Sequence, residues 1–237
     1  MKPIDSIWTE KYRPTRVSEM VGDFKEKIIK YLKDPASIPH FLLYSKSPGT
    51  GKTTLAKAII NELELKRDSL ILNSSDDRKI DTIREKVKEF SMTKGTKPGV
   101  RRVVFLDEFD GMLKASQDAL RNIMETYASN VFFILTCNNI NKVIEPLQSR
   151  CLKVAFTYPD KKEVKTFLEN ICIKEEMKYA DDGLYRLIDM HYPSIRNCVI
   201  ALQDLKTEGH EVTIETVHPV DEVFEDMWKL YKERNWK

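Results

Sequence analysis

The sequence lacks long apolar stretches. Its 237 residues contain no run of about 18 apolar residues, so we expect no segment that crosses a membrane. The first residues, MKPIDSIWTEKYRP, have no apolar core of the kind found in secretory signals, which predicts a protein that is not exported. The sequence also shows no internal repeat and no low-complexity segment.

Cysteine and net charge are also scarce. The cysteines Cys137, Cys151, Cys172 and Cys198 fit no zinc-ligand spacing and stand in apolar segments, so we predict reduced packing residues. The formal net charge is only +2, although 32% of the residues are charged and 41% are hydrophobic. Any surface for nucleic acid must therefore come from a local cluster of basic residues on a globular protein.

Short apolar runs alternate with helical patterns through the first two thirds of the chain. Strands bounded by helices in this way predict an α/β fold with a parallel five-stranded sheet, covered by helices on both faces. The runs are 41–44, 70–72, 103–106, 131–136 and 152–156.

After Tyr158 the character of the sequence changes. Residues 160–177 and 182–206 read as amphipathic helices, and Pro193 with Ser194 is expected to begin the last of them. We predict an α/β domain at 1–158, a small all-helical domain at 159–208 and a C-terminal helical tail at 209–237. The tail has an apolar stripe of Val223, Phe224, Met227, Trp228 and Tyr231.

The strongest local motif stands where the first predicted strand ends and a helix begins. Backbone N–H groups in such a loop, together with the helix N-terminus, bind phosphate groups. Lys52 would reach the β- and γ-phosphates of ATP, and the Thr53 hydroxyl would bind Mg²⁺. The first glycine of the G-x-x-x-x-G-K-[ST] pattern is replaced by Lys46, and a chance glycine-rich turn is the alternative interpretation. The motif comprises Ser47, Pro48, Gly49, Thr50, Gly51, Lys52, Thr53 and Thr54.

Two other predicted strands end in polar residues. The run 103–106 ends in Asp107 and Glu108, about 55 residues after Lys52. We predict that Asp107 holds Mg²⁺, directly or through water, and that Glu108 polarises the attacking water. The run 131–136 leads to Asn138, whose amide could orient water beside the γ-phosphate or could simply form a turn.

A basic cluster lies between the second and third strand runs. Nine Lys or Arg residues and only three acids occur between Arg78 and Arg102. Arg84 and Lys88 are four residues apart and share one helix face. Such a row could contact successive phosphates of a nucleic acid without reading its sequence, or it could be an ordinary solvated helix face. The sequence alone leaves both open.

Taken together, these motifs resemble the AAA+ sliding-clamp loader subunits, of the replication factor C small-subunit and bacteriophage clamp-loader large-subunit type. The resemblance runs from about Trp8 to Leu205 and includes further segments in family order. These are WTEKYRP at 8–14, SDDR at 75–78, SQDALR at 116–121 followed by Met124, Glu125 and Tyr127, and IEPLQSRC at 144–151 with its Ser-Arg-Cys motif.

The resemblance implies roles for individual residues. The domains would be an AAA+ P-loop ATPase domain, a helical lid and a reduced or missing collar. ATP and Mg²⁺ would be the cofactors, with Arg13 joining the loop in binding nucleotide and Thr53 and Asp107 holding the metal. The catalytic residues would be Lys52, Glu108, Asn138 as sensor 1, Arg196 on the lid as sensor 2, and Arg150 as an arginine finger inserted into a neighbouring subunit. DNA would be bound by Arg78, Arg84 and Lys88, and the sliding clamp by Phe90 and Met92.

We therefore expect an ATPase that opens a sliding clamp and loads it on primer–template DNA during replication. Its partners would be the clamp, the DNA backbone and other loader subunits, in a homo- or hetero-oligomer of five, with no membrane. We expect it in the cytoplasm, which is the host cytoplasm for a phage protein, or in a eukaryotic nucleus.

Two alternative functions and three forms of assembly stay open. The chain could be another AAA+ DNA motor, such as a helicase-like ring ATPase, or a non-hydrolysing structural subunit of a loader. The Ser-Arg-Cys motif argues against the first, and intact Lys52 and Glu108 argue against the second. The short segment after the lid fits a shortened chain, a minimal phage-type subunit, or a partner that supplies the collar.

Overall fold

The structure, a computed structural model, describes residues 7–74 and 80–217. The predicted DNA contact Arg78 and the predicted tail helix around Trp228 lie outside these residues. The chain divides into two compact units, of which one is Arg13–Pro159 and the other joins Met1–Tyr12 to Asp160–Lys237. Each unit is described by itself below.

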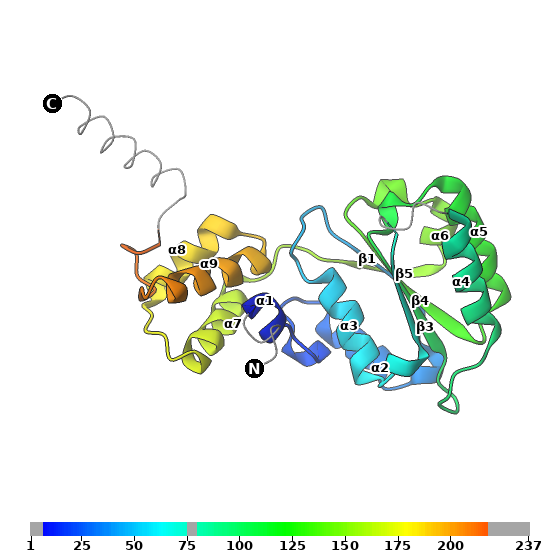
Figure 1. Ribbon diagram of the computed structural model, residues 1–237, viewed down its shortest axis with the longest axis horizontal. Helices are drawn as coiled ribbons and strands as arrows, with labels where there is room; N and C mark the ends of the chain where they lie inside the picture. Colours follow the sequence, from blue (N-terminus) through cyan, green and yellow to red (C-terminus); the bar gives the residue numbers. More distant parts are fainter. Residues whose placement is uncertain (1–6, 75–79, 218–237) are drawn as a thin grey trace, which may run out of the picture. The chain divides into compact units, whose positions relative to one another are not determined.

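A five-stranded sheet forms the centre of the first unit. All of its strand pairs are parallel, and the strand order is β2-β3-β4-β1-β5. This confirms the predicted parallel five-stranded sheet (Figure 1). The strands are β1 (His40–Tyr44), β2 (Ser69–Asn73), β3 (Arg102–Asp107), β4 (Val131–Cys137) and β5 (Cys151–Ala155).

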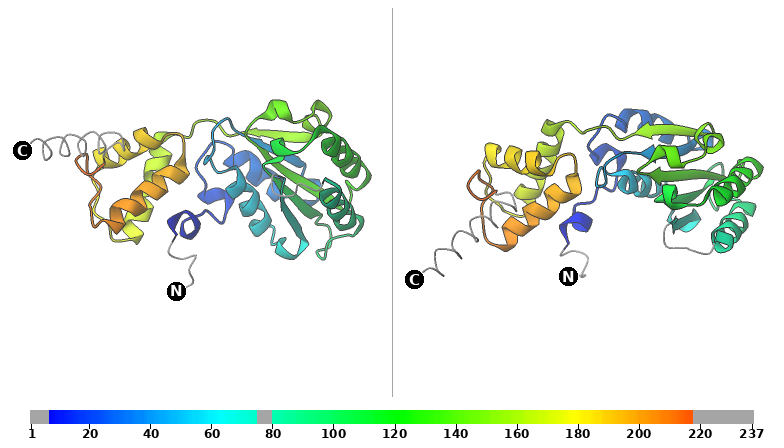
Figure 2. Two further views of the ribbon diagram at one scale, coloured as in Figure 1. Left: turned by 45° about the horizontal axis from the view of Figure 1, so that its top comes forward. Right: turned by 90° about the horizontal axis from the view of Figure 1, so that it is seen from above.

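Helices cover both faces of this sheet (Figures 1 and 2). Side chains alternate between the faces along a strand, so Phe41 and Leu43 of β1 join one buried cluster and Leu42 joins the other. The central strand β4 is buried along its whole length, in keeping with an apolar run that is interrupted only by Thr136. One face carries α2 (Lys25–Leu32) and α3 (Lys52–Glu62), and the other carries α4 (Ile80–Met92), α5 (Lys114–Thr126) and α6 (Glu145–Gln148).

Short 3₁₀ helices connect many of these elements. In the described part of the chain they are η2 (Val17–Glu19), η3 (Pro35–Ser37), η4 (Lys66–Asp68), η5 (Phe109–Gly111) and η6 (Ile140–Lys142). Two of them, η5 and η6, directly follow the carboxyl ends of β3 and β4. They therefore shape the edge of the sheet where the predicted catalytic residues stand.

The second unit is helical. Its helices are α1 (Trp8–Lys11), α7 (Lys161–Lys174), α8 (Asp181–His191) and α9 (Ile195–Thr207). The Ser194 side chain accepts the backbone N–H of Asn197 at 3.3 Å, which confirms the predicted start of the last helix.

The N-terminal helix α1 belongs to this helical unit. Trp8 is buried, and its backbone N–H donates to Oε1 of Gln203 on α9 at 2.9 Å. The Tyr12 hydroxyl and the Lys11 ammonium both donate to Glu175 at 2.5 Å. The predicted division assigned this segment to the α/β domain, but these buried and charged contacts place it with the helices.

The cysteines behave as packing residues, as predicted. All four are free thiols, and burial raises the pKa of Cys137 and of Cys198 to about 12. Such thiols stay neutral near pH 7, so they are poor nucleophiles and poor metal ligands. Within the described ranges no group of three or more His, Cys, Asp or Glu residues could hold a metal ion. None of the helices that the structure describes combines the length and apolarity needed to cross a bilayer.

Candidate functional site

The loop between β1 and α3 has the shape of a phosphate-binding loop. Its backbone takes positive φ angles at Gly49 (+74°) and Gly51 (+100°), a region that side-chain-bearing residues rarely adopt. Lys52 begins the helix, is buried, and donates from Nζ to the Ser47 carbonyl across the loop at 3.2 Å. The loop is therefore folded around its lysine, with the first N–H groups of α3 at its inner edge.

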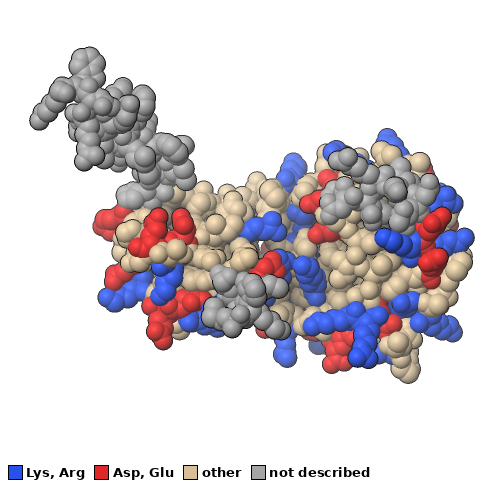
Figure 3. Space-filling view, viewed as in Figure 1, with Lys and Arg blue, Asp and Glu red and all other residues tan. Residues whose placement is uncertain are grey.

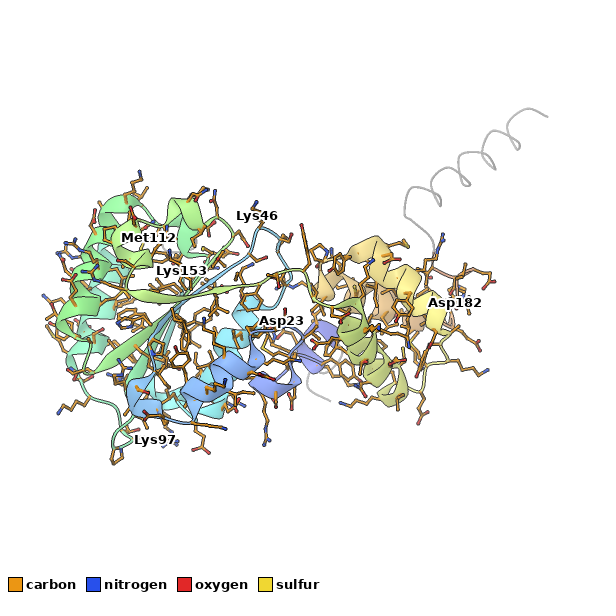
Figure 4. All side chains as sticks on the ribbon, turned by 180° about the vertical axis from the view of Figure 1, so that it is seen from behind. Asp23, Lys46, Lys97, Met112, Lys153 and Asp182 are labelled. Carbon is orange, nitrogen blue, oxygen red and sulfur yellow. The ribbon has the colours of Figure 1, made fainter. Side chains whose placement is uncertain are left out.

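Lys46 does not disturb this loop. The described non-glycine residues with positive φ are Glu64, Glu108 and Glu176, so Lys46 has a backbone conformation that any residue can adopt. Its side chain is exposed and lies at the outer edge of the loop, at the far end of the α/β unit from Lys97 (Figure 4). The departure from the family pattern therefore falls where a glycine is not required.

Asp107, at the end of β3, is held by two hydroxyl groups. The Thr53 hydroxyl donates to both carboxylate oxygens at 3.0 Å, and the Thr136 hydroxyl donates to Oδ1 at 2.5 Å. Thr136 is buried in β4, the strand next to β3, and its oxygen also accepts the Glu108 N–H at 3.1 Å. The sequence prediction gave Thr136 no role, although a hydroxyl at the end of an otherwise apolar strand was the available signal.

The Thr53 and Asp107 oxygens fit a magnesium ion. Mg²⁺ prefers oxygen ligands in an octahedron at about 2.0–2.1 Å, so two adjacent ligands stand about 2.9 Å apart. The observed separation of 3.0 Å between the Thr53 and Asp107 oxygens matches this spacing. These two side chains come from positions 54 residues apart, and the fold brings them together as the motifs predict.

Glu108 turns the chain away from the sheet immediately after Asp107. Its φ of 54° and ψ of 41° are left-handed, and the following η5 buries Phe109. A left-handed conformation of a residue with a side chain costs about 1 kcal/mol or more, so the surrounding contacts must hold it. The Glu108 side chain is exposed at the carboxyl edge of the sheet, where the predicted attacking water would be.

The two asparagines after β4 differ in their surroundings. Asn139 forms a turn, because its side chain accepts the Asn141 N–H at 3.0 Å and caps η6. Asn138 is exposed and directly follows Cys137, whose carbonyl accepts the N–H of Ser45 at 3.3 Å. Asn138 therefore stands beside the start of the phosphate-binding loop, and its sensor role stays a prediction.

Arg150 lies at the other end of the strands from the loop. In the register of the sheet Cys151 pairs with His40 at the start of β1, whereas the loop follows Tyr44 at its end. The intervening strand length is roughly 13 Å at the usual rise of a parallel strand. The Arg150 side chain donates from NH1 to the Pro146 carbonyl at 2.7 Å and forms an ion pair with Glu125.

Two further arginines were predicted to contact the nucleotide. Arg13 is half-buried at the start of the α/β unit. Arg196 is exposed in the first turn of α9, in the helical unit. Nucleotide contact by either residue stays a prediction.

The basic cluster divides into two groups. Arg84 and Lys88 are exposed on α4 and have no ion pair with any other described residue. Arg101 instead supports the fold, since it donates from NH1 to the Ala128 carbonyl at 3.0 Å. Basic and acidic side chains are interspersed over the viewed face of the α/β unit (Figure 3). Arg84 and Lys88 therefore keep the properties of a phosphate-contacting row.

The two residues predicted to bind the clamp also differ. The Arg102 guanidinium lies 3.5 Å from the centroid of the Phe90 ring and donates to the Phe90 carbonyl at 2.8 Å. Met92, at the end of α4, is 51% exposed. Phe90 is thus engaged within the chain, whereas Met92 presents free apolar surface, and clamp contact by both stays a prediction.

Gln117 links the segments that follow β3 and β4. It is fully buried on α5, and its Nε2 donates to the carbonyls of Met112 and Lys142, each at 3.0 Å. Its Oε1 accepts the Ile144 N–H at 2.9 Å. The sequence prediction assigned Gln117 no function, because periodicity alone does not distinguish a buried glutamine from an exposed one.

Gln117→Ala is expected to lower the free energy of unfolding by about 2–4 kcal/mol, since it leaves a cavity and unpaired backbone groups. Gln148→Ala is the matched control, because Gln148 also donates to two carbonyls, at 3.0 and 2.8 Å, but is only half-buried. Urea unfolding followed by circular dichroism measures both. Equal losses in the two variants would contradict a special role for the buried linkage.

Comparisons with known proteins show which family this chain resembles. Residues 41–158 match the family described as ATPase family associated with various cellular activities (AAA). The chain is 40% identical over 220 residues to the replication factor C small subunit of Archaeoglobus fulgidus, covering 90% of this chain and 68% of that protein. It is 36% identical over 236 residues to the same subunit of Methanocella arvoryzae, covering 95% and 73%.

Solved structures agree on the fold. The RuvB Holliday junction branch migration motor of Thermotoga maritima superposes with a TM-score of 0.72 over 86% of this chain and 70% of that one. The sequences are only 19% identical, so this likeness concerns the fold alone. Together with the family match, it confirms an AAA+ α/β domain accompanied by a helical region.

Proposed function

Because the chain belongs to the family of replication factor C small subunits, we propose that it is an ATPase subunit of a complex that loads a sliding clamp on primer–template DNA. Its class as an AAA+ clamp-loader ATPase of DNA replication follows from the family. The proposal adds the residues that act and the way the subunits cooperate. In the same proposal, residues 13–158 form the ATPase domain, residues 159–208 form the lid together with helix α1, and residues 209–237 form the tail.

The observation that carries the proposal is the meeting of Thr53 and Asp107 beside Lys52. In this arrangement Lys52 and the loop amides would hold the phosphates of ATP, and Thr53 and Asp107 would hold Mg²⁺. The metal, when bound, would neutralise charge on the β- and γ-phosphates. Glu108 accepts a proton from the attacking water at the carboxyl edge of the sheet, and Asn138 orients that water.

The site is completed by a neighbouring subunit in this proposal. Arg150 cannot reach the loop of its own chain, because the register of β1 and β5 separates them by the length of a strand. A guanidinium from one subunit would stabilise the charge on the transferring phosphoryl group in the next. ATP would thus be hydrolysed only between assembled subunits.

The number of subunits and the residues that contact DNA and the clamp are also part of this proposal. The family name implies a complex with other subunits, the clamp and DNA, and we propose a ring or spiral of five subunits. Arg84 and Lys88 would follow the DNA backbone, and Met92 would contact the clamp. An intracellular location, without a membrane partner, belongs to this proposal. The mass of the native complex tests the number of subunits.

An ATPase assay with and without the clamp and primed DNA tests the function. A clamp loader is expected to hydrolyse ATP faster when both are present, because their binding favours the hydrolysing state of the complex. Unwinding of a DNA duplex would instead favour a helicase-like motor, and a total lack of hydrolysis would favour a structural subunit. Absence of stimulation by the clamp–DNA pair would refute the loader assignment.

The double variant Arg84→Gln with Lys88→Gln tests the DNA surface. Each lost phosphate contact lowers the slope of log affinity against log salt by about 0.9, so a loss of about 1.8 per subunit is expected. Fluorescence anisotropy with labelled primed DNA measures it. Lys57→Gln is the matched control, because Lys57 is exposed on α3, on the opposite face of the sheet. An unchanged slope in the double variant would remove these residues from the DNA surface.

A further inference from the structure

The guanidinium of Arg150 is held from two sides. Glu125, in the last turn of α5, forms an ion pair with its NH2 group. The Pro146 carbonyl, in α6, accepts from its NH1 group at 2.7 Å. Arg150 itself stands in the short connection between α6 and β5. The Arg150 side chain thus joins α5, α6 and the connection to β5. The two residues of the ion pair, Glu125 and Arg150, are 25 positions apart in the sequence.

The Glu125–Arg150 ion pair contributes little to the stability of the fold. The Arg150 and Glu125 side chains are 37% and 45% exposed. Ion pairs of this exposure contribute about 0–1 kcal/mol to folding, because water screens them and two long side chains lose freedom. The contact instead restricts the rotamers of an arginine that would otherwise sample many directions in solvent.

We propose that Glu125 is a positioning residue for Arg150, which it holds in the orientation from which the guanidinium enters the neighbouring subunit's ATP site. This rests on the proposed function of Arg150 in trans. Arginine has more N–H donors than the two contacts use, so the others can bind a phosphate while the pair persists. Because the ion pair already restricts the Arg150 side chain, less conformational entropy of this side chain is lost when the subunits associate.

The opposite role would be sequestration. A carboxylate that competed with the phosphate for the guanidinium would slow hydrolysis, and its removal would speed the reaction. The Pro146 carbonyl favours positioning, because a backbone acceptor holds the same guanidinium without neutralising its charge. The two roles predict changes of opposite sign in kcat, so one measurement separates them.

The test compares Glu125→Ala and Glu125→Gln in the fully assembled loader with clamp and primed DNA. Glu125→Ala is expected to lower kcat roughly 3- to 10-fold, the cost of immobilising one flexible side chain. Glu125→Gln keeps an oxygen acceptor and is expected to lose less. The KM for ATP should stay unchanged, since the loop of the same chain binds the nucleotide. Asp118→Asn, an exposed carboxylate on the same helix, is the matched control.

A double-mutant cycle with Arg150→Ala shows whether Glu125 acts through Arg150. In the Arg150→Ala background, Glu125→Ala is expected to have no further effect on kcat. An equal effect in both backgrounds, an increase in kcat, or a kcat equal to wild type while Arg150→Ala is inactive would each overturn the inference. If Arg150→Ala itself keeps full activity, the proposed role in trans fails first. The unfolding temperature of each chain verifies that the variants fold.

Discussion

Lys52→Ala is expected to weaken ATP binding by about 10²- to 10³-fold and to abolish measurable hydrolysis. The Lys52 ammonium is buried and directed into the loop, where its Nζ lies 3.2 Å from the Ser47 carbonyl. A hydrogen bond to a charged group contributes about 1.5–3 kcal/mol, and the ammonium would serve two phosphates. Alanine supplies neither the charge nor the donors, although the backbone of the loop is kept.

Lys46→Ala is the matched control for this experiment. It removes the same charge from the same loop, but from an exposed side chain at the outer edge. Nucleotide affinity should change by less than about 2-fold, because surface charges are strongly screened. Titration with a fluorescent ATP analogue measures affinity, and phosphate release measures hydrolysis. A Lys52→Ala variant with wild-type hydrolysis would show that the phosphate site has been misassigned.

Arg150→Ala is expected to lower kcat in the assembled complex by about 10³-fold or more, the usual contribution of an arginine finger. Nucleotide binding by the isolated chain should stay unchanged, because the register of β1 and β5 places Arg150 at the far end of the strands from the loop. Single-turnover hydrolysis measures the rate, and equilibrium titration measures binding. A loss of binding in the isolated chain would show that Arg150 acts within its own subunit.

Mixing two inactive variants tests the shared site directly. Where two copies adjoin, the loop of an Arg150→Ala chain and the arginine of a Lys52→Ala chain form one complete site. Mixed assemblies should therefore regain part of the activity that either variant lacks alone. Each variant assembled separately is the control. No recovery in mixtures that demonstrably contain both chains would contradict a site completed between adjoining copies of this chain.

Local patterns predicted the fold, and they predicted that Thr53 and Asp107 come together at the end of the sheet. Short apolar runs between helical patterns indicate the strands of a parallel sheet, and the five runs correspond to the five parallel strands. The carboxyl ends of parallel strands meet at one edge, so Asp107 was expected near Thr53, and their oxygens are 3.0 Å apart. The resemblance to clamp loaders supplied the role in replication, which relatives at 40% identity confirm.

Tertiary structure alone decided what the basic and polar side chains contact. Nine basic residues looked alike in the cluster, yet Arg102 lies over Phe90 while Arg84 remains exposed. The helix α1 was placed with the sheet, but Trp8 is bonded to Gln203, 195 positions away. Periodicity and spacing report which face of an element is buried. They carry no information on which distant residue is met there, because that depends on how the elements pack.

For the same reason the sequence by itself determined that this chain has a phosphate-binding motif between a strand and a helix, a carboxylate at the end of a neighbouring strand and a parallel sheet between helices. Each of these depends on residues that are neighbours in the chain or on a strand end of known direction. The packing of α5 against α6 decided that Arg150 is held by Glu125, and the sheet register decided that it stands away from its own loop. These contacts join distant parts of the chain, so only the folded structure reveals them.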